Sequence, residues 1–182
     1  MENLQSLNIE LKKYLEEKIS PTLIVELSEL LNDKNINYLN NKSKADTKAL
    51  YFEYQYDYLN IIFWAVDQEG ERITEIIKLP SKEIDIINES DDWDALIPEK
   101  IWVTVTAFED IYEEDNSDDI LDEYNTEKYE LFENWFLECW KKAAEQTKVE
   151  KDAYFSIHDT YFKTDLHSME TINTDEISKR YQ

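Results

Sequence analysis

The sequence predicts an α+β fold, in which a small antiparallel β-meander packs against an N-terminal helical pair and a long amphipathic helix from the C-terminal half. Three observations predict it. Apolar residues recur at helical spacing near the N-terminus and over 126–147, strand patterns separated by a turn occupy 49–79, and 182 residues suit one domain. We expect residues 1–166 to form a single α+β domain and residues 167–182 to be a polar, partly disordered tail.

Two amphipathic segments open the chain. The first covers residues 3–18, where one face is apolar and the opposite face is charged, as in a surface helix. Its apolar residues are Leu4, Leu7, Leu11, Tyr14 and Leu15. Ser20 and Pro21 then match an N-cap followed by proline in the first turn, so we expect a second helix from Ser20 to about residue 31.

The middle of the chain has the pattern of a β-meander. In residues 49–58, apolar or aromatic side chains at the even-numbered positions alternate with mostly polar ones at the odd-numbered positions, which is typical of a half-buried strand. Residues 60–66 form a more uniformly apolar run. Gly70 is the chain's only glycine and closes a short turn that needs a positive φ, and residues 72–78 return as a third strand. Two readings of the tyrosine-rich strand 49–58 stay open: both its faces are covered, or one is an exposed recognition surface.

The C-terminal half is helical again. Residues 98–112 fit a helix or an alternating strand, and we favour the helix. A wide apolar stripe then predicts a long helix over 126–147, and residues 153–158 are expected to add a strand to the sheet. The stripe consists of Tyr129, Phe132, Trp135, Phe136, Cys139, Trp140 and Ala143.

Composition excludes several classes of function. One glycine cannot build a phosphate-binding P-loop or a dinucleotide fingerprint, which need two and three glycines. A lone Cys139 cannot form an intrachain disulfide or a zinc site of several thiolates. Lysine and arginine are scattered in pairs, which argues against nucleic-acid and membrane-surface binding. We expect no cofactor, and because no signal-peptide pattern is present we expect a cytoplasmic protein.

The most unusual feature is the acidic stretch 83–127, which carries 17 carboxylates against one base, Lys100, in a chain of net charge −23. Such a segment repels phosphates and attracts basic surfaces. Interleaved rings, including Tyr124, could supply desolvated anchors for a partner. The predicted surface comprises Asp91, Asp92, Trp93, Asp94, Trp102, Glu109, Asp110, Tyr112, Glu113, Glu114, Asp115, Asp118, Asp119, Asp122 and Glu123.

These observations favour a non-enzymatic acidic domain that binds a basic protein, in its most specific form an immunity or antitoxin-type inhibitor of a basic toxin or nuclease. The oligomeric state is left open between monomer and homodimer. One alternative is a metal-dependent or acid–base enzyme that uses His158, Asp159, Asp165 and His167, because these include both histidines of the chain. Another is a structural or adaptor domain whose charge serves solubility alone.

Overall fold

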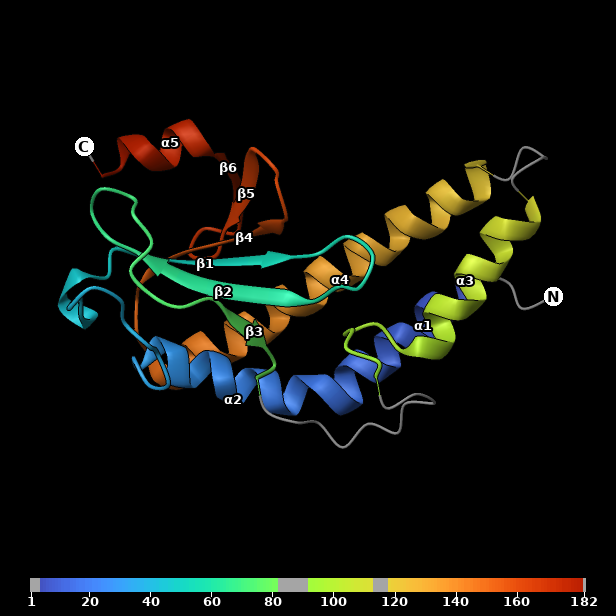
Figure 1. Cartoon of the computed structure of the whole chain (residues 1–182), viewed down its shortest axis with the longest axis horizontal. Coiled ribbons are helices and arrows are strands. Elements are labelled where there is room, and N and C mark those ends of the chain that lie inside the picture. Colours follow the sequence, from blue (N-terminus) through green and yellow to red (C-terminus); the bar gives the residue numbers. More distant parts are fainter. Residues whose placement is uncertain (1–3, 82–91, 113–117, 182) are drawn as a thin grey trace.

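A computed structural model of the chain describes residues 4–81, 92–112 and 118–181. Its centre is a six-stranded sheet with the order β3-β2-β1-β4-β5-β6 (Figure 1). Neighbouring strands run antiparallel, except that β4 runs parallel to β1. The strands are β1 (Ala49–Tyr54), β2 (Ile61–Val66), β3 (Ile77–Leu79), β4 (Asp152–Ile157), β5 (Phe162–Asp165) and β6 (Glu170–Asn173).

Helix α2 and the C-terminal half of α4 cover one face of this sheet, α1 lies beside α3 and α4, and α5 lies toward the other face (Figure 1). The described α-helices are α1 (Leu4–Tyr14), α2 (Ser20–Leu31), α3 (Glu99–Tyr112), α4 (Asp118–Thr147) and α5 (Thr174–Lys179). The α+β class, the N-terminal helices and the long helix packed against the sheet are as the sequence predicted. The helix preferred over 98–112 is also found, as α3.

The main core lies between α4 and the helix-facing side of the sheet. Phe52 of β1 is fully buried and contacts the Phe136 ring at a centroid distance of 5.6 Å. Phe136 also stacks on Phe155 of β4 at 3.9 Å. Because alternate residues of a strand face opposite sides, the same register sends Tyr51 and Glu53 to the other face. Each buried ring stabilises the fold by roughly 1.5–3 kcal/mol through removal of apolar surface from water.

A smaller core on the opposite face is closed by the C-terminal residues. Its buried members are Ala49, Val66, Tyr154, Ile172 and Ile177. The described part of the expected polar tail, residues 167–181, therefore contains a strand and a helix that pack on the sheet. Two of its polar residues have a structural role, because Asn173 and Glu176 form a reciprocal capping box at the start of α5.

The N-terminal helices are continuous with one another. The boundary predicted at Ser20 is occupied by a π-helical turn, Leu15–Ile19, and the backbone N–H of Ser20 donates to the Leu15 carbonyl. The Ser20 hydroxyl donates to the same carbonyl at 3.0 Å, so it does not act as an N-cap. Pro21 has no N–H to donate, and the wider turn before it accommodates that loss.

The sheet also differs from the prediction in detail. The strand expected over 49–58 ends at Tyr54, because residues 55–60 turn back on themselves, with the Gln55 N–H donating to the Asn60 carbonyl. Gly70 has φ +79° in its turn, as its position predicted. The strand near 153–158 joins the sheet as β4, but parallel to β1 on the side away from the meander.

Candidate functional site

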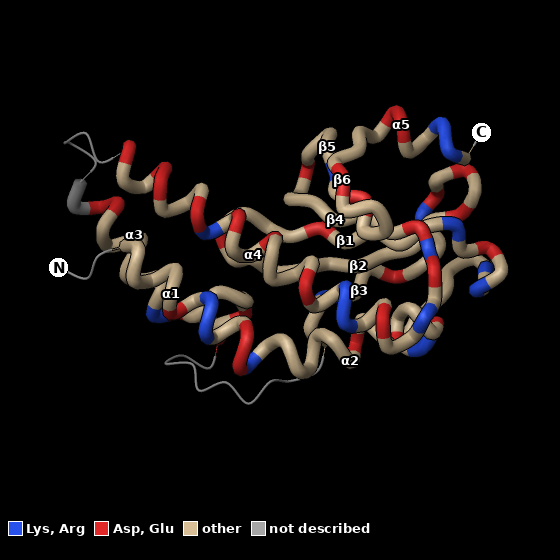
Figure 2. The backbone as a smooth tube through the Cα atoms, turned by 180° about the vertical axis from the view of Figure 1, so that it is seen from behind, with Lys and Arg blue, Asp and Glu red and all other residues tan. Residues whose placement is uncertain are grey.

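Helix α3 and the N-terminal half of α4 project together beyond the sheet (Figure 1). We call the described residues 99–112 and 118–130 the acidic hairpin. Figure 2 shows acidic positions along the N-terminal half of α4 and near the end of α3, with few basic ones. The exposed acids among the predicted surface residues on it are Glu109, Asp110, Asp119, Asp122 and Glu123.

The hairpin's two bases do not compensate these charges. Lys100 lies 3.5 Å from Glu10 of α1, so it is already paired outside the hairpin. Lys128 is buried, with 6% of its surface exposed. Closely spaced exposed carboxylates without neighbouring cations produce a negative potential that extends about one Debye length into solvent, roughly 8–10 Å at physiological salt.

The acids are not placed to stabilise their helices. The last turn of α3 contains Glu109 and Asp110 and no basic residue. The C-terminal end of a helix carries partial negative charge, so two carboxylates there are unfavourable by a few tenths of a kcal/mol or more each. Asp119, by contrast, lies in the first turn of α4, where a negative charge is favourable. Helix stability alone therefore does not explain the acids at the end of α3.

Aromatic rings lie at the base of the hairpin. Trp93 and Trp102 contact each other at a centroid distance of 5.4 Å, and Tyr58 contacts both at 6.0 Å. The Trp93 Nε1–H donates to the Ile97 carbonyl at 2.8 Å, which fixes its half-buried ring. Tyr58 is 40% exposed. We call Tyr58, Trp93 and Trp102 the aromatic cluster. Its rings are held in place by their mutual contacts, so a binding partner would meet a preformed aromatic surface.

The predicted surface residues fall into three groups. Those on the hairpin and in the aromatic cluster lie in one region, and Asp92 and Asp94 are exposed next to Trp93. Tyr112 ends α3 and Asp118 begins α4. The residues that lie outside the described ranges are Asp91, Glu113, Glu114 and Asp115. Tyr124, which the sequence suggested as an anchor, is 1% exposed and belongs to the core.

The β1–β2 loop contains the exposed end of the tyrosine-rich segment, for which a recognition surface is one of the two readings left open by the sequence. Tyr56 is 57% exposed and contacts the Tyr129 ring of α4 at 4.5 Å. The sequence predicts a strand that includes Tyr56, Asp57 and Tyr58, because they continue the alternation of β1, but they lie in the loop that follows it. The signal that could have revealed a turn is the polar Asp57 and Asn60 within it, since both residue types favour turns.

A pocket of about 260 Å³ opens between this loop, α3 and α4. Its lining includes Asp57 from the loop, Trp102 and Glu109 from α3, and Tyr124 and Lys128 from α4. The Tyr124 hydroxyl is buried and has no hydrogen-bond partner in the part of the chain that the structure describes. Burial and the nearby Glu109 carboxylate raise the pKa of Tyr124.

Lys128 is the buried amine of this pocket. Its Nζ donates to the Asn125 Oδ1 at 2.9 Å and lies 4.6 Å from the Tyr129 ring centroid and 5.4 Å from that of Tyr124. Burial lowers the pKa of Lys128 to about 8, although Asp57 and Glu109 favour its charged form. A buried amine with a depressed pKa beside a pocket is a common feature of functional sites.

The four residues of the metal or acid–base alternative do not form one site. His158 Nδ1 lies 2.9 Å from Glu53 Oε2, and His158 Nε2 lies 3.4 Å from Asp159. Asp165 instead accepts from Arg180 at 2.6 Å and from the backbone N–H of His167 at 2.9 Å. Within the described ranges, no group of three or more His, Cys, Asp or Glu side chains could hold a metal ion.

Glu53 is the centre of a polar network on the open face of the sheet. Besides His158 it accepts from Lys163 Nζ at 2.9 Å, and Lys163 also donates to the Ser156 hydroxyl at 3.1 Å. Lys163 Nζ lies 5.8 Å from the Tyr51 ring centroid. The network satisfies the hydrogen-bonding capacity of a buried carboxylate.

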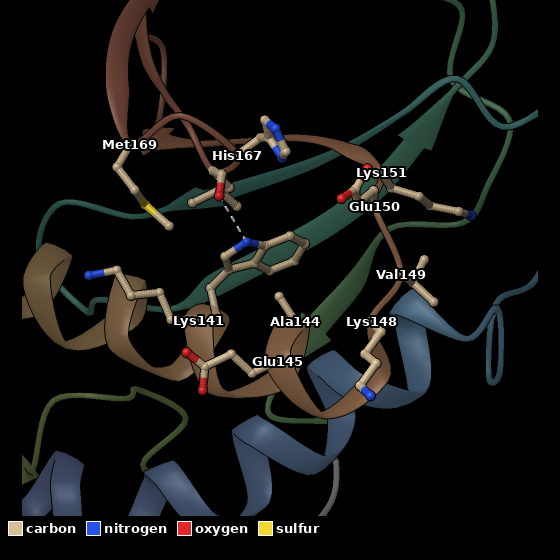
Figure 3. Close-up of a pocket in the computed structure, with 11 residues that line it drawn as sticks. Lys141, Ala144, Glu145, Lys148, Val149, Glu150, Lys151, His167 and Met169 are labelled. Atoms are coloured by element: carbon tan, nitrogen blue, oxygen red, sulfur yellow. Dashed lines mark hydrogen bonds between the residues drawn. The ribbon is translucent and has the colours of Figure 1, made fainter.

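A second pocket, of about 390 Å³, lies where the C-terminal end of α4 meets the β5–β6 turn, beside His167 (Figure 3). Figure 3 shows Lys141, Lys148 and Lys151 on its border pointing in different directions, so these three amines do not surround one anion. Glu145 and Glu150 also line it and oppose anion binding. Its geometry therefore favours no particular ligand.

Comparisons of the chain with protein-family models, with curated proteins and with solved structures gave no match. Among the helices of the described residues, none combines the length and the apolar character needed to cross a membrane.

Proposed function

We propose that this chain is a cytoplasmic, non-enzymatic protein that binds a basic protein through its acidic hairpin and aromatic cluster. In its most specific form it is an inhibitor of the immunity or antitoxin type, which docks on a basic toxin or nuclease. One observation carries the proposal: among exposed acids that also occur over the rest of the surface, seven lie on a projecting element whose own bases are paired elsewhere or buried. These seven acids are Glu109, Asp110, Asp119, Asp122, Glu123, Glu127 and Glu130.

The projecting shape supports this use of the charge. The projecting element, in which α1 packs against α3 and α4, can enter a concave cationic surface, where the carboxylates of α3 and α4 take the positions of nucleic-acid phosphates. Arginine side chains of the partner would meet them in charge-assisted, bidentate hydrogen bonds. Such complementarity raises association rates by about 10- to 1,000-fold at low salt.

The aromatic cluster supports a second part of the interaction. Charge at the rim of an interface changes association rates more than it changes affinity, so stable binding needs desolvated anchors. Tyr58 and Trp102 are partly exposed, and stack at 6.0 Å beside the acids. In the proposed complex these rings are covered by the partner while the carboxylates fix its orientation.

The test is binding of the purified chain to the purified basic product of the neighbouring gene. One variant carries four charge reversals on the hairpin: Glu109→Lys, Asp110→Lys, Asp119→Lys and Glu123→Lys. A matched control carries four reversals at exposed acids elsewhere: Glu17→Lys, Glu69→Lys, Glu145→Lys and Glu150→Lys. Both variants change the net charge equally.

We expect the hairpin variant to lose about 100-fold or more in affinity at low salt, and the control to change by about threefold or less. Circular dichroism checks that both variants are folded. Wild-type affinity in the hairpin variant, or equal losses in both variants, would contradict the proposal. No association of the wild-type chain with a basic partner would favour the structural or adaptor role.

A further inference from the structure

We propose that Lys128 is a reactive amine that condenses reversibly with a small neutral aldehyde or ketone entering the pocket between the β1–β2 loop, α3 and α4. This activity is separate from the proposed binding of a basic protein. Three observations carry it: the pocket itself, the position of the amine in its wall, and the hydrogen bonding of that amine.

The hydrogen bonding fits a condensed amine better than a free ammonium. An ammonium has three N–H donors, and in the described structure Lys128 Nζ has one hydrogen-bond acceptor, Asn125 Oδ1 at 2.9 Å. Burying an ammonium with unused donors is costly. A protonated imine has a single N–H, which the Asn125 side chain satisfies.

The surroundings stabilise a cation that is weakly hydrated. The ring faces of Tyr124 and Tyr129 lie 5.4 and 4.6 Å from Nζ, at distances typical of cation–π contacts. Asp57 from the β1–β2 loop and Glu109 from α3 add negative charge to the pocket wall. The rings and carboxylates stabilise the positive charge of a protonated imine as they stabilise that of the ammonium. The imine charge is delocalised and less strongly hydrated, so less hydration is lost on burial.

The free amine is available at neutral pH. With a pKa of about 8, roughly a quarter of Lys128 is neutral at pH 7.5, whereas an ordinary lysine of pKa 10.4 is neutral to about 0.1%. The neutral amine is the nucleophile in carbonyl chemistry, as in proteins that use lysine Schiff bases. Among the groups facing it, Asp57 and Glu109 favour the ammonium, and burial opposes it more strongly.

The reaction balances without an oxidant or reductant. The Nζ lone pair attacks the carbonyl carbon, a C–N bond forms as the C=O π bond breaks, and one proton passes from nitrogen to oxygen, directly or through solvent, to give the hydroxyl of a neutral carbinolamine. A proton from solvent at the pocket mouth converts this hydroxyl into leaving water, and the C–O bond breaks as the C=N bond forms. The product is a protonated imine and one water, and hydrolysis reverses the sequence.

The pocket limits the class of carbonyl compound. A volume of about 260 Å³ suits a small molecule, and Trp102, Val105 and Ile97 provide apolar wall. Asp57 and Glu109 disfavour an anionic compound. The Tyr124 hydroxyl is available to donate a hydrogen bond to the carbonyl oxygen, because it is buried and has no partner in the described residues.

The test is reductive trapping with benzaldehyde and cyanoborohydride at pH 7.5, followed by mass spectrometry of every lysine-containing peptide. We expect Lys128 to be alkylated at least about 10-fold faster than exposed lysines such as Lys13 and Lys142. The anionic analogue 4-carboxybenzaldehyde should label Lys128 more slowly than benzaldehyde does. Labelling of Lys128 at or below the rate of the exposed lysines would overturn the proposal.

Two variants sharpen the test. Lys128→Arg keeps a cation but removes the nucleophile, so the fast phase of total labelling should disappear. Val105→Trp leaves Lys128 in place and fills the pocket, so labelling of Lys128 should slow by about 10-fold, and an unchanged rate would contradict entry through this pocket. If either variant fails to fold, site-resolved labelling of the wild-type protein still decides. The result is independent of whether a basic partner binds.

Discussion

The two halves of α4 lie in different environments although they belong to one uninterrupted helix. The C-terminal half buries Phe132, Phe136 and Trp140 against the sheet and α2. The N-terminal half projects beyond the sheet and carries the exposed acids Asp119, Asp122, Glu123, Glu127 and Glu130, beside an exposed Ile120. Within the N-terminal half the charge lies on exposed positions while Tyr124 is buried in the core, so the acids can be changed while the buried side chains are kept.

The largest expected effect comes from truncating a ring in the packed half. Phe136→Ala removes a fully buried side chain that stacks on Phe155 at 3.9 Å. We expect a loss of about 3–5 kcal/mol in the free energy of unfolding, measured with urea, because a cavity remains. Ile120→Ala, in the projecting half, should change it by less than about 0.5 kcal/mol. Similar losses in both variants would show that the projecting half is packed as tightly as the other.

The next effect compares a buried ion pair of the sheet with an exposed pair on α4. Lys163→Met removes the ammonium that pairs with the buried Glu53 and leaves the His158 ring nitrogen in contact with that carboxylate, at a cost of about 3 kcal/mol. Lys141→Met breaks an exposed, solvent-screened pair with Glu138 and should leave the free energy of unfolding nearly unchanged. Urea unfolding at pH 7 measures both. Equal costs would mean that the Glu53 network is solvated rather than structural.

The pH dependence of stability tests the buried amine of the hairpin. Between pH 8 and 10.5 the unfolded chain keeps the Lys128 proton and the folded chain loses it, so folded stability should rise with pH. Relative to Lys128→Met, the wild-type protein should gain about 2 kcal/mol between pH 7 and 9.5. The difference should be flat below pH 7, where both states are protonated. A constant difference up to pH 9.5 would mean that the pKa of Lys128 is not depressed.

The smallest effect concerns the hairpin acids themselves. Neutralising Glu109 and Asp110 with Gln and Asn removes negative charge from the C-terminal end of α3, so stability should increase by about 0.3–1 kcal/mol per residue. Asp119→Asn removes a favourable charge from the first turn of α4 and should decrease it by a similar amount. Thermal unfolding at low salt measures these shifts. A loss of stability on neutralising the α3 acids would make their role structural.

The sequence predicted the elements whose side chains repeat over many residues. The apolar stripe of α4 and the alternation of β1 are local patterns, and burial on one face follows from them directly. β5 and β6 were missed because each has four residues and a largely polar sequence that packing against the sheet, not periodicity, keeps in place. The parallel pairing of β4 with β1 could not be predicted, since it depends on how α4 crosses the sheet.

The candidate surface was predictable in part. Composition located the acids, because charge density can be counted along the chain. The pocket beside Lys128 could not be found in this way, because it joins a loop near Tyr56, a turn of α3 near Trp102 and a turn of α4 near Tyr129. These segments are far apart in sequence and each is unremarkable alone. The four residues of the metal alternative do not form a metal site in the described structure, because Asp165 is paired with Arg180.

The most direct test of the binding role is the association rate constant with the basic partner as a function of ionic strength. It is measured by stopped-flow for the wild-type chain and for the hairpin and control charge-reversal variants. We expect the wild-type and control rates to fall steeply, by about 10-fold or more between 10 and 200 mM salt, and the hairpin variant to be slow and nearly independent of salt. A hairpin variant that keeps the wild-type salt dependence would contradict the claim that the charge of α3 and α4 recognises the partner.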